Sequence, residues 1–172
     1  MTGVGTMAGN AKELQAAFWK AIHAERTVML ACEGVYPRPM TALAENDSGP
    51  LWFFTAQAND LAEAVARKAR PGLVMLASKG HELFATAGGT LSLDNDPVVI
   101  ERLWNPWVAA WYEGGKDDPK LRLLRFDPDA AEIWRNENSL WAGLKMMVGV
   151  DPKQSYEDDV ATVKLRGARA RG

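Results

Sequence analysis

The chain has 172 residues, a length that suits one domain with a sizeable buried core. Apolar residues make up 47% and charged residues 24%, as in an ordinary soluble protein, and a net charge of −2 gives no reason to expect nucleic acid or an anionic membrane as partner. The only cysteine, Cys32, excludes an internal disulfide, and no apolar run approaches the ~20 residues that span a bilayer. Residues 1–10 lack the cationic start and apolar block of a signal peptide, so we expect a cytoplasmic protein.

The first third of the sequence predicts one helix followed by short strands. An apolar stripe with a spacing of four residues predicts a helix over residues 10–25 that Asn10 caps. Pro37 and Pro39 cannot donate to a strand ladder and therefore predict a sheet edge or a bulge. Strands are predicted over 27–31, 40–44 and 51–55, with a turn and strand entry over 34–39.

The rest of the sequence predicts more strands with helices between them. Asn59 begins a helix that Arg70-Pro71-Gly72 ends, and Asn105-Pro106 ends a later one. Gly88-Gly89 inside a long strand indicates a bulge or a barrel corner, and Asp127-Pro128 indicates a turn between two strands. The strands are predicted over 73–77, 82–93, 121–127, 130–135 and 160–165, and the helices over 97–104 and 139–148, with a further short helix within 107–118.

This order predicts a mainly β protein with peripheral helices. Strands dominate the expected core, and short hairpin-like connections outnumber β-α-β crossovers. An antiparallel barrel is therefore favoured over a doubly wound sheet. We expect one domain over residues 11–165, between a flexible N-terminus at 1–10 and a flexible basic tail at 166–172.

The sequence offers few groups for catalysis by the protein itself. It contains no phosphate-binding glycine loop of the P-loop or dinucleotide type and no Gly-x-Ser-x-Gly nucleophile elbow. His23 and His81 are the only histidines, and no cysteine or histidine pair has the spacing of metal ligands. No catalytic residue or metal site is predicted, so any chemistry would come from a cofactor.

A flavin would suit a group of three polar residues. Arg38 on one strand and Thr55 at the end of another could bind its phosphate, and Asn59 adds an amide at a helix start. The same residues also fit a surface strand charge, a strand-end hydroxyl and a plain helix cap. From these residues alone both interpretations stay open.

Several segments of the chain together resemble a known family. They are RPMTAL (38–43), LWFFT (51–55), FATAGGTLSL (84–93), VVIERLW (98–104), EGGKDDPKLRLLRF (113–126) and AEIW (131–134). Their order and spacing resemble the general stress protein branch of the pyridoxamine 5′-phosphate oxidase-like superfamily, over residues 11–165.

The resemblance implies a split β-barrel homodimer with two FMN sites at the dimer interface. It implies that Arg38 contacts the phosphate or ribityl chain and that Met40 lies beside the isoalloxazine. Phe54 and Thr55 would give backbone and hydroxyl contacts. Trp134 would pack near the ring from the other subunit.

The chain departs from the family pattern next to the phosphate. The family usually places serine and lysine four and six positions after the threonine, where this chain has Asn59 and Leu61. Asparagine can still donate a hydrogen bond, but leucine cannot replace a cation that pairs with phosphate. Such a charge-assisted bond contributes roughly 1.5–3 kcal/mol, so FMN binding is expected to be roughly ten- to a hundredfold weaker.

We therefore expect an FMN-binding protein of the general stress type that acts as a weak oxidoreductase. Authentic pyridoxamine-phosphate oxidase activity is not expected, because no basic set for a second phosphate is evident. One alternative is a non-enzymatic small-molecule binder in stress responses with weak or no FMN binding. Another is an oxidoreductase of the same fold that uses deazaflavin or haem, with His23 or His81 near the haem.

Overall fold

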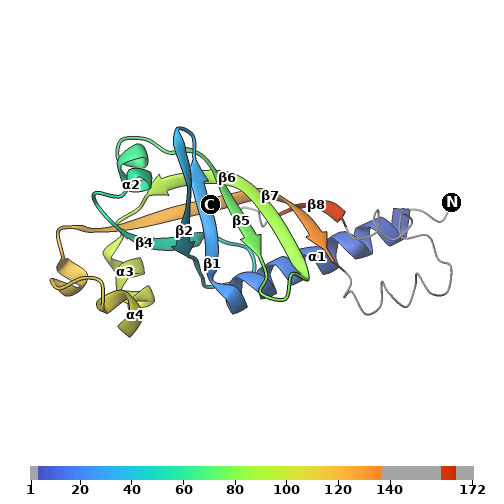
Figure 1. Cartoon of the computed structure of the whole chain (residues 1–172), viewed down its shortest axis with the longest axis horizontal. Helices are drawn as coiled ribbons and strands as arrows, with labels where there is room; N and C mark the ends of the chain where they lie inside the picture. Colours follow the sequence, from blue (N-terminus) through green and yellow to red (C-terminus); the bar gives the residue numbers. More distant parts are fainter. Residues whose placement is uncertain (1–3, 137–159, 166–172) are drawn as a thin grey trace.

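A computed structural model describes residues 4–136 and 160–165 of the chain (Figure 1). The predicted helix over 139–148 and the basic tail over 166–172 lie outside these residues. None of the described helices is long and apolar enough to cross a membrane. The elements are α1 (Val4–Glu25), β1 (Thr27–Cys32), β2 (Val35–Thr41), β3 (Leu43–Ala44), β4 (Leu51–Ala56), α2 (Asp60–Val65), β5 (Arg70–Ala77), β6 (Leu83–Leu93), α3 (Pro97–Leu103), α4 (Pro106–Ala109), a 3-10 turn (Gly115–Asp117), β7 (Leu121–Arg135) and β8 (Val160–Lys164).

The strands form one curled antiparallel sheet. Its strand order is β2-β1-β5-β6-β7-β4-β3, and β8 pairs with the far part of β7. The two end strands, β2 and β3, are separated in the chain by Ala42 alone, and β2 also contacts β4. The sheet therefore curls back on itself with helices at its periphery, which confirms the predicted architecture (Figure 1).

The proline-bearing strand β2 lies at one end of the strand order, as its sequence predicts. It pairs with β1 in a register that places Pro39 opposite Met29 and Arg38 opposite Leu30. Prolines at 37 and 39 cost little there, because an edge strand leaves one row of backbone groups unpaired.

Strand β7 is longer than predicted, and the expected turn at Asp127-Pro128 is wrong. Asp127 pairs with Thr90 and Pro128 with Gly89, inside one continuous strand. The register shifts between Gly88 and Gly89, so the strand bends at a bulge and does not end. A proline is tolerated at such a bulge.

Two other predicted boundaries are corrected, and a third is confirmed. Helix α1 begins at Val4, so Asn10 lies inside it and does not cap it. Arg70-Pro71-Gly72 belongs to β5, where the Arg70 guanidinium donates to the carbonyl of Ala64 at 2.7 Å. The predicted helix end before Asn105 is confirmed, because α3 ends at Leu103. Asn105-Pro106 also begins α4: the Asn105 side chain accepts from the backbone N–H groups of Trp107 and Val108, and Pro106 takes the first helical position.

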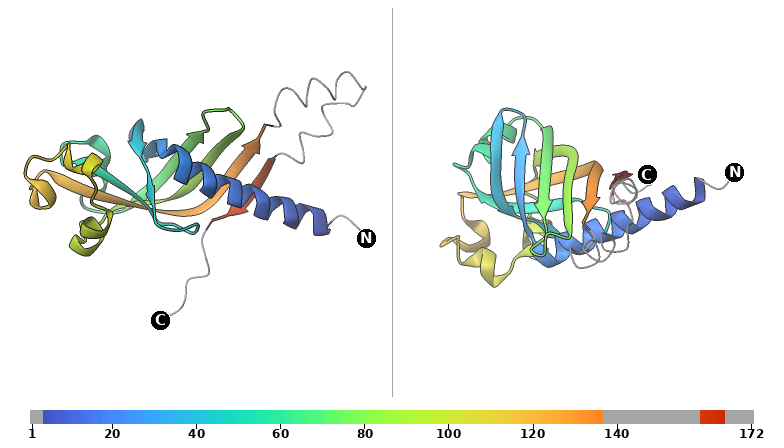
Figure 2. Two further views of the ribbon diagram at one scale, coloured as in Figure 1. Left: turned by 90° about the horizontal axis from the view of Figure 1, so that it is seen from below. Right: turned by 45° about the vertical axis from the view of Figure 1, so that its right-hand side comes forward.

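Two apolar clusters hold these elements together. The inner cluster fills the curled sheet, which α1 covers along one side with Leu14, Phe18 and Ile22 (Figure 2). The outer cluster lies between the opposite face of β4 and β7 and helix α3, and consists of Trp52, Val99, Ile100, Leu121 and Leu123. Strand β4 is therefore buried on both faces, which fixes the position of its last residues.

Candidate functional site

The elements that carry Arg38, Thr55 and Asn59 contact one another, since β2 contacts both β4 and α2. The Arg38 guanidinium on β2 forms an ion pair with the carboxylate of Asp60, the first residue of α2. The backbone N–H of Asn59 donates to the carbonyl of Ala56, next to Thr55, at 3.0 Å. We call the group of Arg38, Thr55, Asn59 and Asp60 the α2 corner.

Asn59 caps α2 as predicted. Its side-chain oxygen accepts from the backbone N–H of Leu61 at 2.9 Å. The amide nitrogen is therefore the part of this side chain that can donate to a ligand. Leu61 itself is completely buried in the inner cluster, so its side chain serves the core and only its backbone lies at the corner.

Thr55 places a hydroxyl near the C-terminal end of β4. It is 7% exposed and is the only buried polar residue in the part of the chain whose burial the structure describes. Its neighbours on the same face, Leu51 and Phe53, belong to the inner cluster. The Thr55 hydroxyl thus continues, with a polar group, the face on which Leu51 and Phe53 contribute apolar side chains.

Arg122 is a member of this region that sequence reasoning missed. It is the direct partner of Thr55 in the β4–β7 ladder, so the two side chains share one face of the sheet. Its guanidinium donates to the Gln57 side-chain oxygen at 2.7 Å and to the carbonyls of Pro119 and Leu121. The signal that would have found it is the pairing of the strands at 51–55 and 121–127 in this register.

The other two predicted residues on β2 and β4 point in different directions. Met40 follows Arg38 by two residues and packs, half-buried, against the inner cluster. Phe54 packs against the outer cluster, with its ring centroid 6.0 Å from that of Trp104 in an edge-on contact. The Phe54 side chain thus points away from Thr55.

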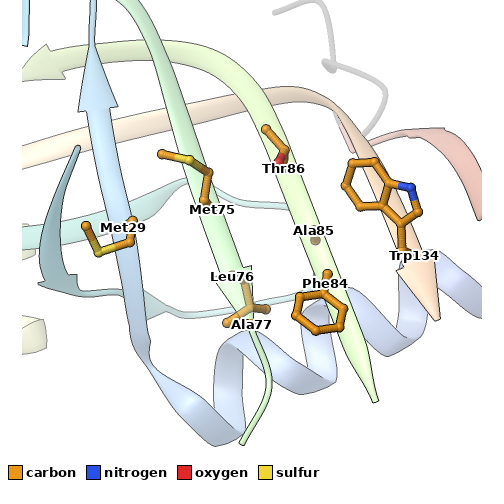
Figure 3. A pocket seen from close by; sticks show the side chains of 8 residues that line it. All are labelled: Met29, Met75, Leu76, Ala77, Phe84, Ala85, Thr86 and Trp134. Carbon is orange, nitrogen blue, oxygen red and sulfur yellow. The ribbon is translucent and has the colours of Figure 1, made fainter. Parts of the chain in front are cut away.

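Trp134 lies far from the α2 corner within one chain. It stands twelve residues beyond Arg122 on β7, roughly 40 Å when measured along a strand. There it lines a groove of about 310 Å³ on the outside of the sheet, together with Met29, Met75, Phe84 and Thr86 (Figure 3). A single chain therefore does not bring Trp134 to the residues of the corner.

The outer face around this groove is unusually apolar for a surface. Met29 is 38% exposed, Leu73 44% and Phe84 39%, on three adjacent strands. Strand β5 carries no charge from Pro71 to Ala77. A sheet with one face in water normally alternates apolar and polar residues, so this face has the character of one that is covered.

The donors of the α2 corner, together with the adjacent Arg122, suit an anion that also carries hydroxyl groups. Arg38 and Arg122 supply positive charge, and Thr55 and Asn59 supply neutral donors. The carboxylate of Asp60 opposes this charge. In the described part of the chain no three His, Cys, Asp or Glu residues are arranged to hold a metal ion.

Two groups with perturbed pKa values, Tyr112 and Glu45, lie beside the outer cluster. Burial, with a smaller contribution from the Asp118 carboxylate, raises the pKa of Tyr112 to about 12. A hydrogen bond from Arg102 lowers the pKa of Glu45. Both residues lie on the α3–α4 side, where Tyr112 contacts Trp104 and Arg102 belongs to α3.

Comparison with known structures identifies close relatives. A Xanthomonas citri protein named a general stress FMN/FAD binding protein is 54% identical, with a TM-score of 0.70, over 74% of this chain and 92% of that one. A Xanthomonas campestris pv. campestris protein assigned to a general stress family is 55% identical, with a TM-score of 0.69, over 74% of this chain and 90% of that one. No curated protein matches the chain.

A third structure extends the similarity over more of the chain. A Jannaschia sp. CCS1 protein assigned as general stress protein 26 has a TM-score of 0.75 at 29% identity, over 90% of this chain and 99% of that one. This similarity confirms the predicted split β-barrel. The family model described as pyridoxamine 5′-phosphate oxidase like matches residues 13–157. The chain therefore belongs to the pyridoxamine 5′-phosphate oxidase-like family, in its general stress branch.

Proposed function

We propose that the protein binds a flavin, FMN, with the phosphate end at the α2 corner. The observation that carries this proposal is that β2 contacts both β4 and α2, the elements that carry Thr55 and Asn59, and that Arg38 pairs with Asp60 at the start of α2. The name of the Xanthomonas citri relative, an FMN/FAD binding protein, supports the same ligand.

The residues of the corner fit a phosphate and a ribityl chain in chemical type. Arg38 and Arg122 would neutralise the phosphate, while the Thr55 hydroxyl and the Asn59 amide would donate to phosphate or ribityl oxygens. Met40, on the same strand as Arg38 and half-buried, would lie beside the isoalloxazine. Phe54 would contribute through its backbone, since its side chain packs on Trp104.

A second copy of the chain would complete the site. Trp134 lies at the opposite end of β7 from Arg122, so it can approach a flavin at the corner only from a partner subunit. The apolar outer face around Met29, Leu73 and Phe84 is the surface through which we propose that two copies pack. The resulting homodimer would carry a site at each α2 corner.

The proposed role of the chain is to bind and orient the cofactor. A bound flavin supplies hydride or electron transfer, and the protein supplies binding and electrostatics. We propose a weak oxidoreductase in the cytoplasm, where a free buried thiol such as that of Cys32 stays reduced. Reduction by a nicotinamide nucleotide followed by turnover of an acceptor would support an enzyme, whereas a flavin that stays oxidised would indicate a binding protein.

The test is a titration of the full chain with FMN, followed by quenching of flavin and tryptophan fluorescence. Saturable quenching is expected, and Arg38→Ala should weaken binding roughly tenfold or more, because a charge-assisted bond to phosphate is lost. Arg67→Ala is the matched control, since Arg67 is exposed just beyond α2. A wild-type protein that shows no quenching would refute FMN binding, and equal affinity of wild type and Arg38→Ala would refute the placement of the phosphate.

A further inference from the structure

The cation at the centre of the α2 corner is paired with an anion of its own chain. The Arg38 guanidinium contacts the Asp60 carboxylate, and both side chains are partly exposed, 40% for Arg38 and 56% for Asp60. An ion pair in such a setting is weak and exchanges readily with water or with another anion. A ligand phosphate at Arg38 must therefore displace this carboxylate or lie beside it.

The residues on either side of Asp60 in the sequence carry no positive charge that could offset its carboxylate. Leu61 is completely buried in the inner cluster, and Asn59 is neutral and caps the helix. Arg122 lies opposite Thr55, where its guanidinium is held by Gln57 and by two backbone carbonyls. The local pair of Arg38 and Asp60 is thus electrically neutral.

We propose that Asp60 is a specificity-determining residue that weakens the binding of phosphorylated flavins relative to uncharged riboflavin. This inference rests on the proposed flavin function of the same site. Asp60 acts in two ways: it occupies the guanidinium that would receive the phosphate, and it repels the phosphate charge. Riboflavin has no phosphate, so its affinity does not depend on this carboxylate.

The size of the effect follows from the charges. A phosphate monoester carries a charge of roughly −1.5 to −2 at neutral pH. A carboxylate roughly 5 Å away in a water-like dielectric then weakens its binding about tenfold. Added salt should reduce this factor, because screening acts on partly exposed charges.

The experiment compares Asp60→Asn with Glu63→Gln in the full-length protein. Both substitutions remove one negative charge from the same helix, and Glu63 is exposed one turn further along. Dissociation constants for FMN and for riboflavin are measured by fluorescence at low and at high salt. We expect Asp60→Asn to bind FMN about tenfold more tightly at low salt, with riboflavin unchanged to within about twofold. Glu63→Gln should change neither constant by more than about twofold.

Comparing the affinities for FMN and riboflavin distinguishes a wrong role for Asp60 from a wrong flavin site. If riboflavin binds as before and FMN binds no more tightly to Asp60→Asn, the role of Asp60 is refuted while the site stands. If both flavins gain equally, the effect is not one of charge selection, and the inference is also refuted. If neither flavin binds to the wild type or to either variant, the proposed function fails together with the inference.

Discussion

Arg122 shows how a residue without a sequence signal enters the candidate site. It lies opposite Thr55 in the β4–β7 ladder, and its guanidinium reaches Gln57 near the start of α2. Leu61 cannot supply the cation expected at its own position, because it is buried in the inner cluster. In the proposed site, Arg122 would supply a cation from β7 in place of the one that Leu61 lacks.

The first prediction concerns this replacement. Arg122→Gln should weaken FMN binding about tenfold and leave riboflavin binding within about threefold, because only FMN carries the phosphate charge. Lys120→Gln is the control, since Lys120 is an exposed cation just before the same strand. Equilibrium dialysis with each flavin measures both constants, and an equal loss for the two flavins would show that Arg122 only supports the loop at Pro119.

A second residue-scale prediction concerns Tyr112. Burial raises its pKa to about 12, so the neutral phenol is favoured in the folded state. The stability linked to this phenol is complete below the unfolded pKa of about 10 and is lost as the pH rises towards 12. The wild type should thus lose more stability than Tyr112→Phe across this interval.

Two measurements check the Tyr112 prediction. The difference in tyrosinate absorbance between wild type and Tyr112→Phe should show a titration step near 12. Denaturant midpoints measured at several alkaline pH values should converge for the two proteins as the pH rises, if Tyr112→Phe is the less stable one at neutral pH. A step that titrates near the ordinary value of about 10 would contradict the burial of this phenol.

The role of a residue could be predicted from the sequence only where it depends on residues that are close in the sequence. The Asn59 cap was predicted correctly, because capping depends on the next three residues. The direction of Phe54 could not be predicted, because it depends on the outer cluster, which forms from distant segments.

At the scale of elements, the bulge between β6 and β7 explains both a correct and a wrong prediction. The glycine pair at 88–89 indicated a bulge, and the register does shift there. The turn expected at Asp127-Pro128 was wrong because Asp-Pro is also tolerated opposite a bulge. The local sequence shows that Asp-Pro favours a turn, but it does not show which strand will pair with these residues and override that preference.

The third prediction uses the two glycines as a matched pair. A Cβ on Gly89 would lie 2.2 Å from the Asp127 carbonyl oxygen and 2.9 Å from the Phe126 ring, whereas a Cβ on Gly88 meets nothing within 4 Å. Gly89→Ala should therefore destabilise the protein by about 3 kcal/mol or more. Gly88→Ala should change stability by about 0.5 kcal/mol or less.

Urea unfolding of the two alanine variants provides the test. A clear loss for Gly89→Ala beside a near-wild-type Gly88→Ala is the expected pattern. Equal midpoints for both variants would show that the strand does not bend at Gly89.

At the scale of the whole molecule, the barrel could be predicted from strand order and motif spacing, but its surface could not. The strand-rich order and the family motifs are distributed along most of the chain, so errors at single boundaries did not change the architecture. The apolar outer face was not predicted, because Met29, Leu73 and Phe84 come together only after β1, β5 and β6 pair.

The fourth prediction concerns that outer face. If two copies pack through it, Leu73→Lys should convert a dimer into a monomer, because burial of a lysine without a partner is costly. Val98→Lys is the control: Val98 is 66% exposed on α3, away from β5. Sedimentation velocity gives the mass of each protein, and a Leu73→Lys variant that stays dimeric would place the interface elsewhere.

The most direct test of the central claim is a crystal structure of the full chain with saturating FMN. The proposed function predicts the phosphate within hydrogen-bonding distance of the Arg38 guanidinium and close to Thr55 and Asn59. It also predicts the isoalloxazine near Met40, with Trp134 of the partner subunit beside it. A flavin bound away from Arg38, or crystals that contain no flavin under these conditions, would contradict the proposed site.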